Sequence, residues 1–236
     1  RRQILGAGLG PGDIERLLRR RRGVRLMDGV YLDHTGCPTW RQRAWAGVLV
    51  SWPAALRGLS AVHAVDRSVE VGGLVHVAVD RARTRPTPRK GYEVRRVVDL
   101  AGSVQWNVNP PRQRYEEAVI DVAAEARDDL AAVAVLTAAC SGRFTTAARL
   151  RAALATRSRV ARRPWLAAVL ADVEAGACSV LEHGYLTRVE RPHGLPAAAR
   201  QLRQLTDAGV VYRDVGYDGG VVVVELDGRV FHADPS

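Results

Sequence analysis

The N-terminal stretch reads RRQILGAGLGPGDIERLLRRRRGVRLMDGVYLDH, residues 1–34. We expect a short helix to begin near Pro11, after a Gly-rich turn, because proline is favoured in the first helical turn. Asp13 and Glu15 would lie in that first turn, where carboxylates complement the helix dipole. Ile14, Leu17 and Leu18 recur at the spacing of one helical face, which predicts that this face is buried.

The stretch continues with basic and β-forming residues. The other face of the helix is predicted to carry Arg16, Arg19, Arg20, Arg21 and Arg22. Two short strands, Val24–Met27 and Gly29–Leu32, follow around an Asp28-Gly29 turn. Helix, tight turn, basic helix and hairpin predict a winged helix-turn-helix, whose second helix enters the major groove of DNA. The expected DNA contacts are Arg16, Arg19, Arg20, Arg22 and Arg25.

An ordinary amphipathic helix with a solvated charged face is the alternative for this stretch. Five arginines on one short helix repel one another, so an anionic partner would offset them. The whole chain has 35 Lys+Arg against 25 Asp+Glu, a net charge of +10. Codon bias explains why Lys90 is the only lysine, but it does not explain the surplus of positive charge. That surplus favours double-stranded DNA as a partner, because phosphate contacts release counterions.

A second arginine-rich segment and three cysteines bear on the partner and the compartment of the protein. Residues 143–163 hold seven arginines and no acid, so they form an alternative basic surface. Cys37, Cys140 and Cys178 lie far apart and match no short motif, which favours a reducing compartment over disulfides or zinc. No stretch has the roughly 20 apolar residues that span a membrane, and no signal peptide is visible. We therefore expect a cytoplasmic protein without a membrane partner.

The middle of the chain, 39–176, is predicted to be a mostly helical domain with a small β-hairpin. Thr39 is the expected N-cap of helices over 39–66, with a break at Pro53. Val75–Val79 and Tyr92–Val98 alternate as the two strands of the hairpin. Pro110 and Pro111 are expected to open a helical stretch that runs to about Gly176. The arginines of the 81–91 loop either contact phosphate or are solvated.

The last segment, 177–236, changes character. A helix over Ser179–Arg191 is predicted, with Ser179 as N-cap and Glu182 at the third helical position. Three strands follow, over Arg200–Leu205, Val210–Tyr217 and Val221–Leu226, although the first of them also fits a helical period. The valine run Val221–Val224 predicts a central strand that is buried on both faces.

Carboxylates gather at one end of that predicted sheet. Asp214 and Glu225 lie on neighbouring strands, and Asp227 follows on the face of Glu225 because strand side chains alternate. Such carboxylates repel unless a hard cation such as Mg²⁺ lies between them, and Mn²⁺ can substitute. Glu182 is a candidate fourth oxygen ligand, and His232 a candidate general acid or base. The alternative is that these residues only form turns and a helix cap.

Two stretches resemble known families. The motifs S-V-L-E-H-G-Y-L, Y-R-D-V and V-V-V-E-L-D-G-R-V-F-H, from about Cys178, resemble the very short patch repair endonuclease-like domain of the restriction-endonuclease fold. That resemblance implies that Asp214 is the first metal-binding carboxylate, that Glu225 is the second, and that His232 matches a family histidine. R-R-Q-I-L-G-A-G-L through G-V-Y-L is similar to the winged-helix domain of AbiEi-type antitoxins.

The sequence departs from the endonuclease pattern in two ways. The family pattern is D…(D/E)-x-K, and Asp227 stands where it has lysine. The sequence also ends four residues after His232, whereas the family's fold adds a helix and a strand there, so this domain is expected to be incomplete.

The expected architecture is α+β: a winged helix over 1–38, the mostly helical 39–176 and an endonuclease-like mixed sheet over 177–236. The leading functional hypothesis is DNA binding coupled to Mg²⁺-dependent hydrolysis of phosphodiester bonds. The alternative is a non-catalytic antitoxin or repressor with a degenerate nuclease domain, for which a cognate toxin and a second copy of the chain are candidate partners.

Overall fold

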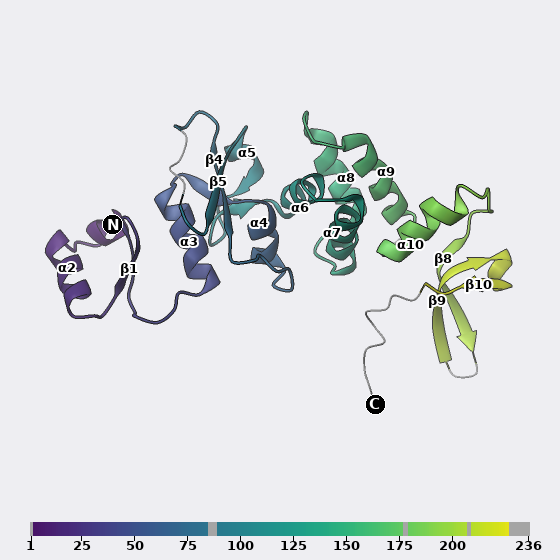
Figure 1. Ribbon diagram of the computed structural model, residues 1–236, viewed down its shortest axis with the longest axis horizontal. Coiled ribbons are helices and arrows are strands. Elements are labelled where there is room, and N and C mark those ends of the chain that lie inside the picture. Colours follow the sequence, from purple (N-terminus) through teal and green to yellow (C-terminus); the bar gives the residue numbers. More distant parts are fainter. Residues whose placement is uncertain (1, 85–88, 177–178, 207–208, 227–236) are drawn as a thin grey trace. The chain divides into compact units, whose positions relative to one another are not determined.

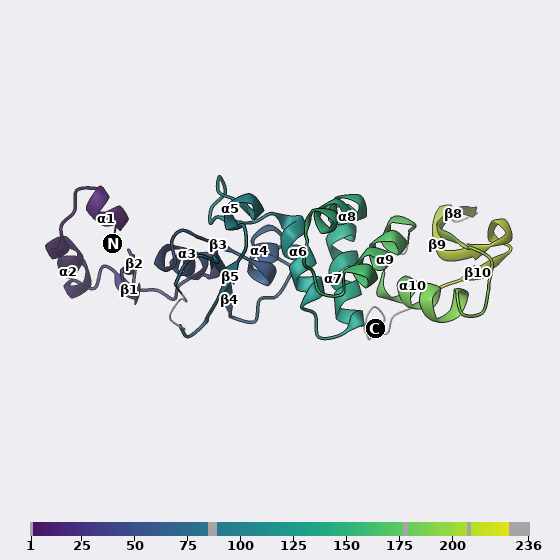
Figure 2. The ribbon, with the colours of Figure 1, turned by 90° about the horizontal axis from the view of Figure 1, so that it is seen from above.

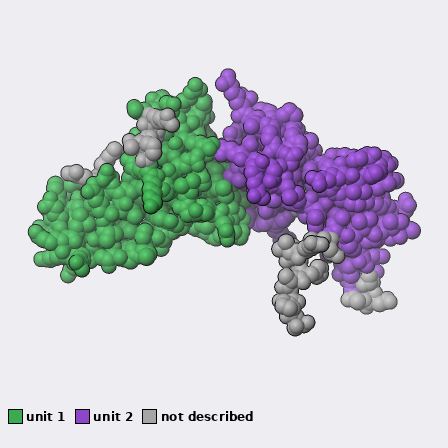
Figure 3. Space-filling model, in the orientation of Figure 1, with its two compact units in different colours: residues 1–118 green, residues 119–236 purple. Residues whose placement is uncertain are grey.

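The computed structural model describes residues 2–84, 89–176, 179–206 and 209–226, without the side chains of Arg2 and Thr206. The chain divides into two compact units, residues 1–118 (unit 1) and 119–236 (unit 2), shown in Figure 3. Helices and several sheets occur together, so the expected α+β class is confirmed.

The N-terminal part of unit 1 contains two helices and a hairpin. Helix α1 covers Arg2–Gly6 and α2 covers Pro11–Arg19, and antiparallel strands β1 (Val24–Met27) and β2 (Val30–Leu32) follow. The predicted start of α2 is confirmed, with Pro11 in its first turn. Asp13 closes that turn by accepting a 2.8 Å hydrogen bond from the Gly10 N–H.

The prediction that all five arginines share one helix is wrong. Helix α2 ends at Arg19, and residues 20–22 form the turn that leads to β1. Arg21 adopts a left-handed φ of 51° in that turn. After the turn, Gly23 packs so closely on β2 that a Cβ would clash with the backbone oxygen of Leu32, so only glycine fits this position.

The rest of unit 1 is built around a five-stranded sheet of order β5-β4-β3-β7-β6 (Figure 1). Its buried centre is made of valines, alanines and a leucine from β3 and β4, including Leu56, Val75, Val77, Ala78 and Val79. The elements in chain order are α3 (Trp40–Val50), β3 (Ala54–Leu56), α4 (Gly58–Val65), β4 (Val75–Asp80), β5 (Tyr92–Val97), α5 (Leu100–Ser103), β6 (Val104–Gln105) and β7 (Arg112–Gln113).

Three expectations for this region need correction. The predicted hairpin is wrong, because β4 and β5 pair in parallel, from Val75 opposite Tyr92 to Asp80 opposite Val97. In a parallel pair, the chain must return from the end of β4 to a point beside its start before β5 begins. Residues 81–91 are enough to cover that distance, because an extended chain spans about 3.3 Å per residue. The stretch 39–66 is interrupted by β3, which pairs with both β4 and β7. Pro110 and Pro111 precede β7 rather than a helix.

Unit 2 begins within helix α6 and continues with helices α7 to α9. Asp128 and Thr146 accept hydrogen bonds from the first turns of α7 and α8, as expected of N-caps. Leu136, Leu150, Leu166 and Leu170 are fully buried among these helices. The bounds are α6 Tyr115–Ala124, α7 Asp129–Ser141, α8 Ala147–Thr156 and α9 Arg163–Glu174.

The last elements of unit 2 are a helix and a small sheet. Ser179 is confirmed as the N-cap of α10 (Val180–Tyr185), which continues as a π-helix over Leu186–Glu190. Both ribbon views place α10 beside the antiparallel sheet of order β10-β9-β8 (Figures 1 and 2). These strands cover Ala199–Thr206 (β8), Gly209–Tyr217 (β9) and Val222–Val224 (β10). Residues Arg200–Leu205, which fit either a strand or a helix in the sequence, therefore form a strand.

The prediction of a buried central valine strand is wrong. Within the described residues β10 lies at one end of the strand order, and β9 is the central strand. Val221 is 83% and Val222 is 50% exposed, whereas Val215 of β9 is fully buried. A valine run favours a strand through its β-branched side chains, but this preference is the same at an edge and at the centre.

Candidate functional site

The N-terminal basic segment, which we define as residues 16–25, presents its charges to solvent. Arg19, Arg20, Arg21 and Arg22 are exposed and form no ion pair within the described part of the chain. They lie at the end of α2 and in the turn before the β1–β2 hairpin. Four neighbouring guanidinium groups without carboxylates make a concentrated positive surface.

The other two predicted DNA contacts in this segment, Arg16 and Arg25, form weak ion pairs with nearby carboxylates. Arg16 lies 3.4 Å from Asp13, and Arg25 pairs with Asp28. The arginine side chains are 55% and 56% exposed, so solvent screens both pairs and each contributes little to stability. A phosphate can therefore replace either carboxylate at small cost.

The second basic segment, residues 143–163, is different because acids of unit 2 neutralise much of it. Arg151 pairs with Glu174, Arg157 lies 2.6 Å from Asp121, and Arg162 pairs with Asp129. Arg163 donates a 3.0 Å hydrogen bond to the carbonyl of Ala155. These contacts hold α8 against its neighbours, so this surface is less basic than its sequence implies.

The structure brings Asp214 and Glu225 to the same end of the β9–β10 pair. Asp214 is in β9 and accepts a 2.8 Å hydrogen bond from the backbone N–H of Leu226. Glu225 follows β10 and forms a 2.8 Å ion pair with Arg213, whose Nε also donates to Gln204. Protein groups thus engage both carboxylates, and Arg213 supplies the positive charge between the strands.

Of the other predicted ligands, only Glu182 belongs to the described residues. Glu182 is buried in α10, where it accepts a 3.0 Å hydrogen bond from the Gln201 amide. Asp227 and His232 lie outside the described residues, so their predicted roles stay predictions. Within residues 2–84, 89–176, 179–206 and 209–226, no group of three His, Cys, Asp or Glu side chains could hold a metal ion.

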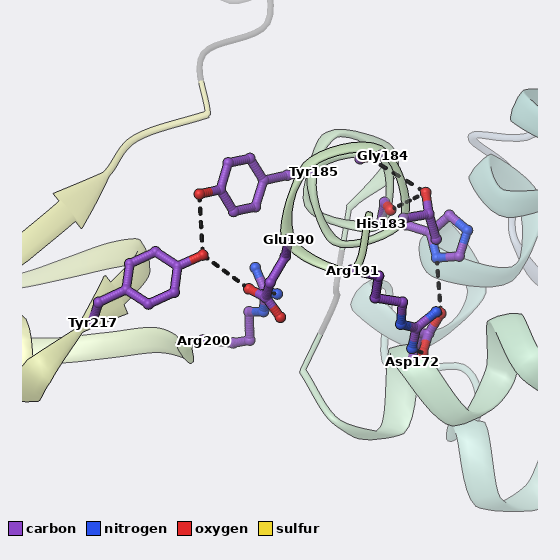
Figure 4. A network of polar contacts seen from close by, with 9 residues as sticks. Asp172, His183, Gly184, Tyr185, Glu190, Arg191, Arg200 and Tyr217 are labelled. Atoms are coloured by element: carbon purple, nitrogen blue, oxygen red, sulfur yellow. Dashed lines mark hydrogen bonds and ion pairs between the residues drawn. The ribbon is translucent and has the colours of Figure 1, made fainter. Parts of the chain in front are cut away.

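A buried polar network joins the π-helix to the sheet of unit 2 (Figure 4). Glu190, at the end of the π-helix, lies 2.7 Å from Arg200 of β8, and the two side chains are only 8% and 7% exposed. Tyr217 of β9 donates a 3.1 Å hydrogen bond to Glu190 and contacts the Tyr185 hydroxyl at 3.1 Å. Burial, followed by these two hydrogen bonds, raises the pKa of Tyr217, so its phenol stays protonated and remains a donor.

A second group of charges lies on the helical side of this network. Arg191 forms a bidentate pair with the buried Asp172 of α9, and His183 of α10 lies 3.4 Å from the same carboxylate. Burial lowers the pKa of His183 more than the Asp172 carboxylate raises it, and Arg191 lowers it further. The negative charge of Asp172 is therefore balanced by Arg191 rather than by His183. The contacts of Asp172 with His183 and Arg191 fix α10 on α9.

Sequence reasoning identified neither buried group, because their members are far apart in the chain. The local sequence predicts only that Arg200 belongs to a strand and that Glu190 lies near the end of a helix. It does not predict that the two side chains meet. The change from α-helix to π-helix after Tyr185 has no sequence signature of its own, although π-helical turns often occur at functional sites.

The described part of the chain has no helix that is long and apolar enough to cross a membrane. A comparison with protein-family models gives no match to this chain, and a comparison with curated proteins gives none either.

Proposed function

We propose that this protein binds duplex DNA through its N-terminal basic segment, with α2 as the helix that enters the major groove and β1–β2 as the wing. The observation that carries this proposal is the exposed run Arg19 to Arg22, which no carboxylate neutralises in the described part of the chain. Phosphate contacts from such a run supply affinity for any duplex, and a helix in the groove supplies sequence preference.

The order of the N-terminal elements supports the same proposal. A short helix, a Gly-rich turn, a second helix and a hairpin occur in the order of a winged helix-turn-helix. The turn over residues 20–22 places part of the positive charge beside the hairpin rather than along α2. A wing that follows the groove would then contact the phosphate backbone next to the helix.

Binding is expected to depend steeply on salt. Six phosphate contacts would give a slope of about −5 in log K against log salt, because each contact contributes about −0.9. Fluorescence anisotropy with a labelled duplex between about 50 and 200 mM salt measures this slope. An affinity that hardly changes over this range would contradict a phosphate-based interface.

For the C-terminal sheet, the geometry supports a non-catalytic role better than hydrolysis. Arg213 and the Leu226 N–H already engage Glu225 and Asp214, so a metal ion would have to displace the arginine. We therefore infer a DNA-binding regulator of the repressor or antitoxin type. Metal-dependent cleavage is the second candidate, supported by the position of Asp214 and Glu225 at one end of the sheet.

A nicking assay separates these two candidates. We expect supercoiled plasmid to remain intact with either Mg²⁺ or EDTA, because Glu225 is held by Arg213. Nicking that needs Mg²⁺, is lost in Asp214→Asn and persists in Asp218→Asn would establish cleavage instead. Asp218 is a matched control because it is an exposed carboxylate in the turn after the same strand. In that case His232→Ala should slow the reaction by about 10²–10⁴.

A further inference from the structure

Three arginines from separate elements of unit 1 meet near the N-terminus of α3. Arg41 is the second residue of α3, Arg67 follows α4, and Arg112 opens β7. The guanidinium carbon of Arg67 lies 5.2 Å from the ring centroid of Trp40, the first residue of α3. Arg41 donates a 3.3 Å hydrogen bond to the carbonyl of Asn109, three residues before Arg112. The cluster is therefore built by tertiary structure and is invisible in the sequence.

Carboxylates do not balance this cluster. Arg41, Arg67 and Arg112 form no ion pair within the described ranges. Burial lowers the pKa of Arg112, and Arg67 and Arg41 lower it further, so Arg112 lies within electrostatic range of both other arginines. The N-terminus of the 11-residue helix α3 adds its own positive dipole end. Arg41 and Arg67 are exposed, so solvent screens part of this repulsion, and an anion bound between the arginines would offset the rest.

Two buried donors in the cluster also lack an acceptor. The Nε of Arg112 and the indole Nε1 of Trp40 are buried, and neither has a hydrogen-bond partner in the described part of the chain. A buried donor without a partner costs about 1–3 kcal/mol, so native proteins keep few of them. An ordered water or an ion is a common explanation for such a group.

We infer that Arg41, Arg67 and Arg112, together with Trp40, form a binding site for a phosphate group. Guanidinium groups match phosphate oxygens in a bidentate geometry, and the N-terminus of a helix favours the same anion. The phosphate belongs either to the backbone of DNA or to a small phosphorylated ligand. The site is separate from residues 16–25, so it does not depend on the function proposed for that segment.

Inorganic phosphate is the first probe, used with the full chain and without DNA. We expect phosphate, compared with chloride at equal ionic strength, to raise the melting temperature of the wild type. The double variant Arg41→Gln/Arg112→Gln should lose this increase. It should also melt higher than the wild type in chloride, because the repulsion and the buried donor are gone. A purely structural role for these arginines predicts lower stability in both buffers.

Arg81→Gln/Arg96→Gln is the matched control, because both arginines are exposed and belong to the same unit. It should keep the full response to phosphate. A response lost equally in both double variants, or kept in both, overturns the site. If the wild type shows no response, the site is overturned for free phosphate and the DNA experiment decides the rest.

DNA affinity then identifies the source of the phosphate. If the group belongs to the DNA backbone, Arg41→Gln/Arg112→Gln weakens duplex binding about 100-fold and reduces the salt slope by about 1.8. If it belongs to a small ligand, duplex affinity falls no more than in the control variant, while the response to phosphate is lost. A double variant that matches its control in both experiments rejects the proposal, whatever the outcome for residues 16–25.

Discussion

Arg19→Glu/Arg20→Glu/Arg22→Glu should weaken binding to duplex DNA by at least about 100-fold at low salt. The three side chains are exposed and no ion pair engages them within the described residues, so their reversal removes attraction from phosphate and adds repulsion. Loss of three phosphate contacts also reduces the salt slope by about 2.7, since each contact contributes about 0.9. Anisotropy titrations at several salt concentrations measure both quantities.

A matched control separates a local interface from a general effect of charge. Arg143→Glu/Arg149→Glu/Arg159→Glu changes the net charge by the same amount, in the other basic segment. We expect it to reduce affinity far less, because acids of unit 2 already neutralise much of that segment. If the control loses DNA binding and the N-terminal variant keeps it, the interface lies on residues 143–163. Equal losses would indicate attraction without a defined interface.

Local chemistry in the sequence predicted where the helices α2, α3 and α10 begin. Thr39 and Ser179, the two predicted N-caps, each accept a hydrogen bond from the N–H three residues later. Pro11 opens α2 for a similarly local reason. These signals involve residues within one helical turn, so no knowledge of the tertiary structure is needed to read them.

Strand pairing was predicted less well, because it depends on distant residues. The pattern of Val75–Val79 and Tyr92–Val98 identified both strands, yet their alternation is the same in parallel and antiparallel pairs. Strand β3 has only three residues, all fully buried, so it shows no alternation. The valines of β10 identified a strand but not its place in the sheet.

For the candidate sites too, features set by neighbouring residues were predicted and features set by distant residues were not. The exposed charge of Arg19 to Arg22 was predicted from composition, because arginines without nearby acids in the sequence often stay unpaired. The phosphate cluster of Arg41, Arg67 and Arg112 was not predicted, since it exists only once α3, α4 and β7 pack together.

The buried pair of Glu190 and Arg200 makes the second large prediction, which concerns stability. Arg200→Met should lower the free energy of unfolding by about 3–5 kcal/mol, because it leaves the Glu190 carboxylate buried without its cation. Tyr217→Phe should cost about 1 kcal/mol, because it removes one hydrogen bond to the same carboxylate. Urea unfolding measures both changes, and hydrogen exchange of the β9 amides locates them in unit 2.

Two further variants test whether the cost comes from the uncompensated charge rather than from lost contacts. Arg203→Met removes an exposed arginine from the same strand, β8, and should change stability by less than about 0.5 kcal/mol. Glu190→Leu/Arg200→Met removes both charges and should recover most of the loss, because two apolar side chains need no desolvated partner. If the double variant is as unstable as Arg200→Met, packing by the arginine stem, and not charge pairing, holds the π-helix on the sheet.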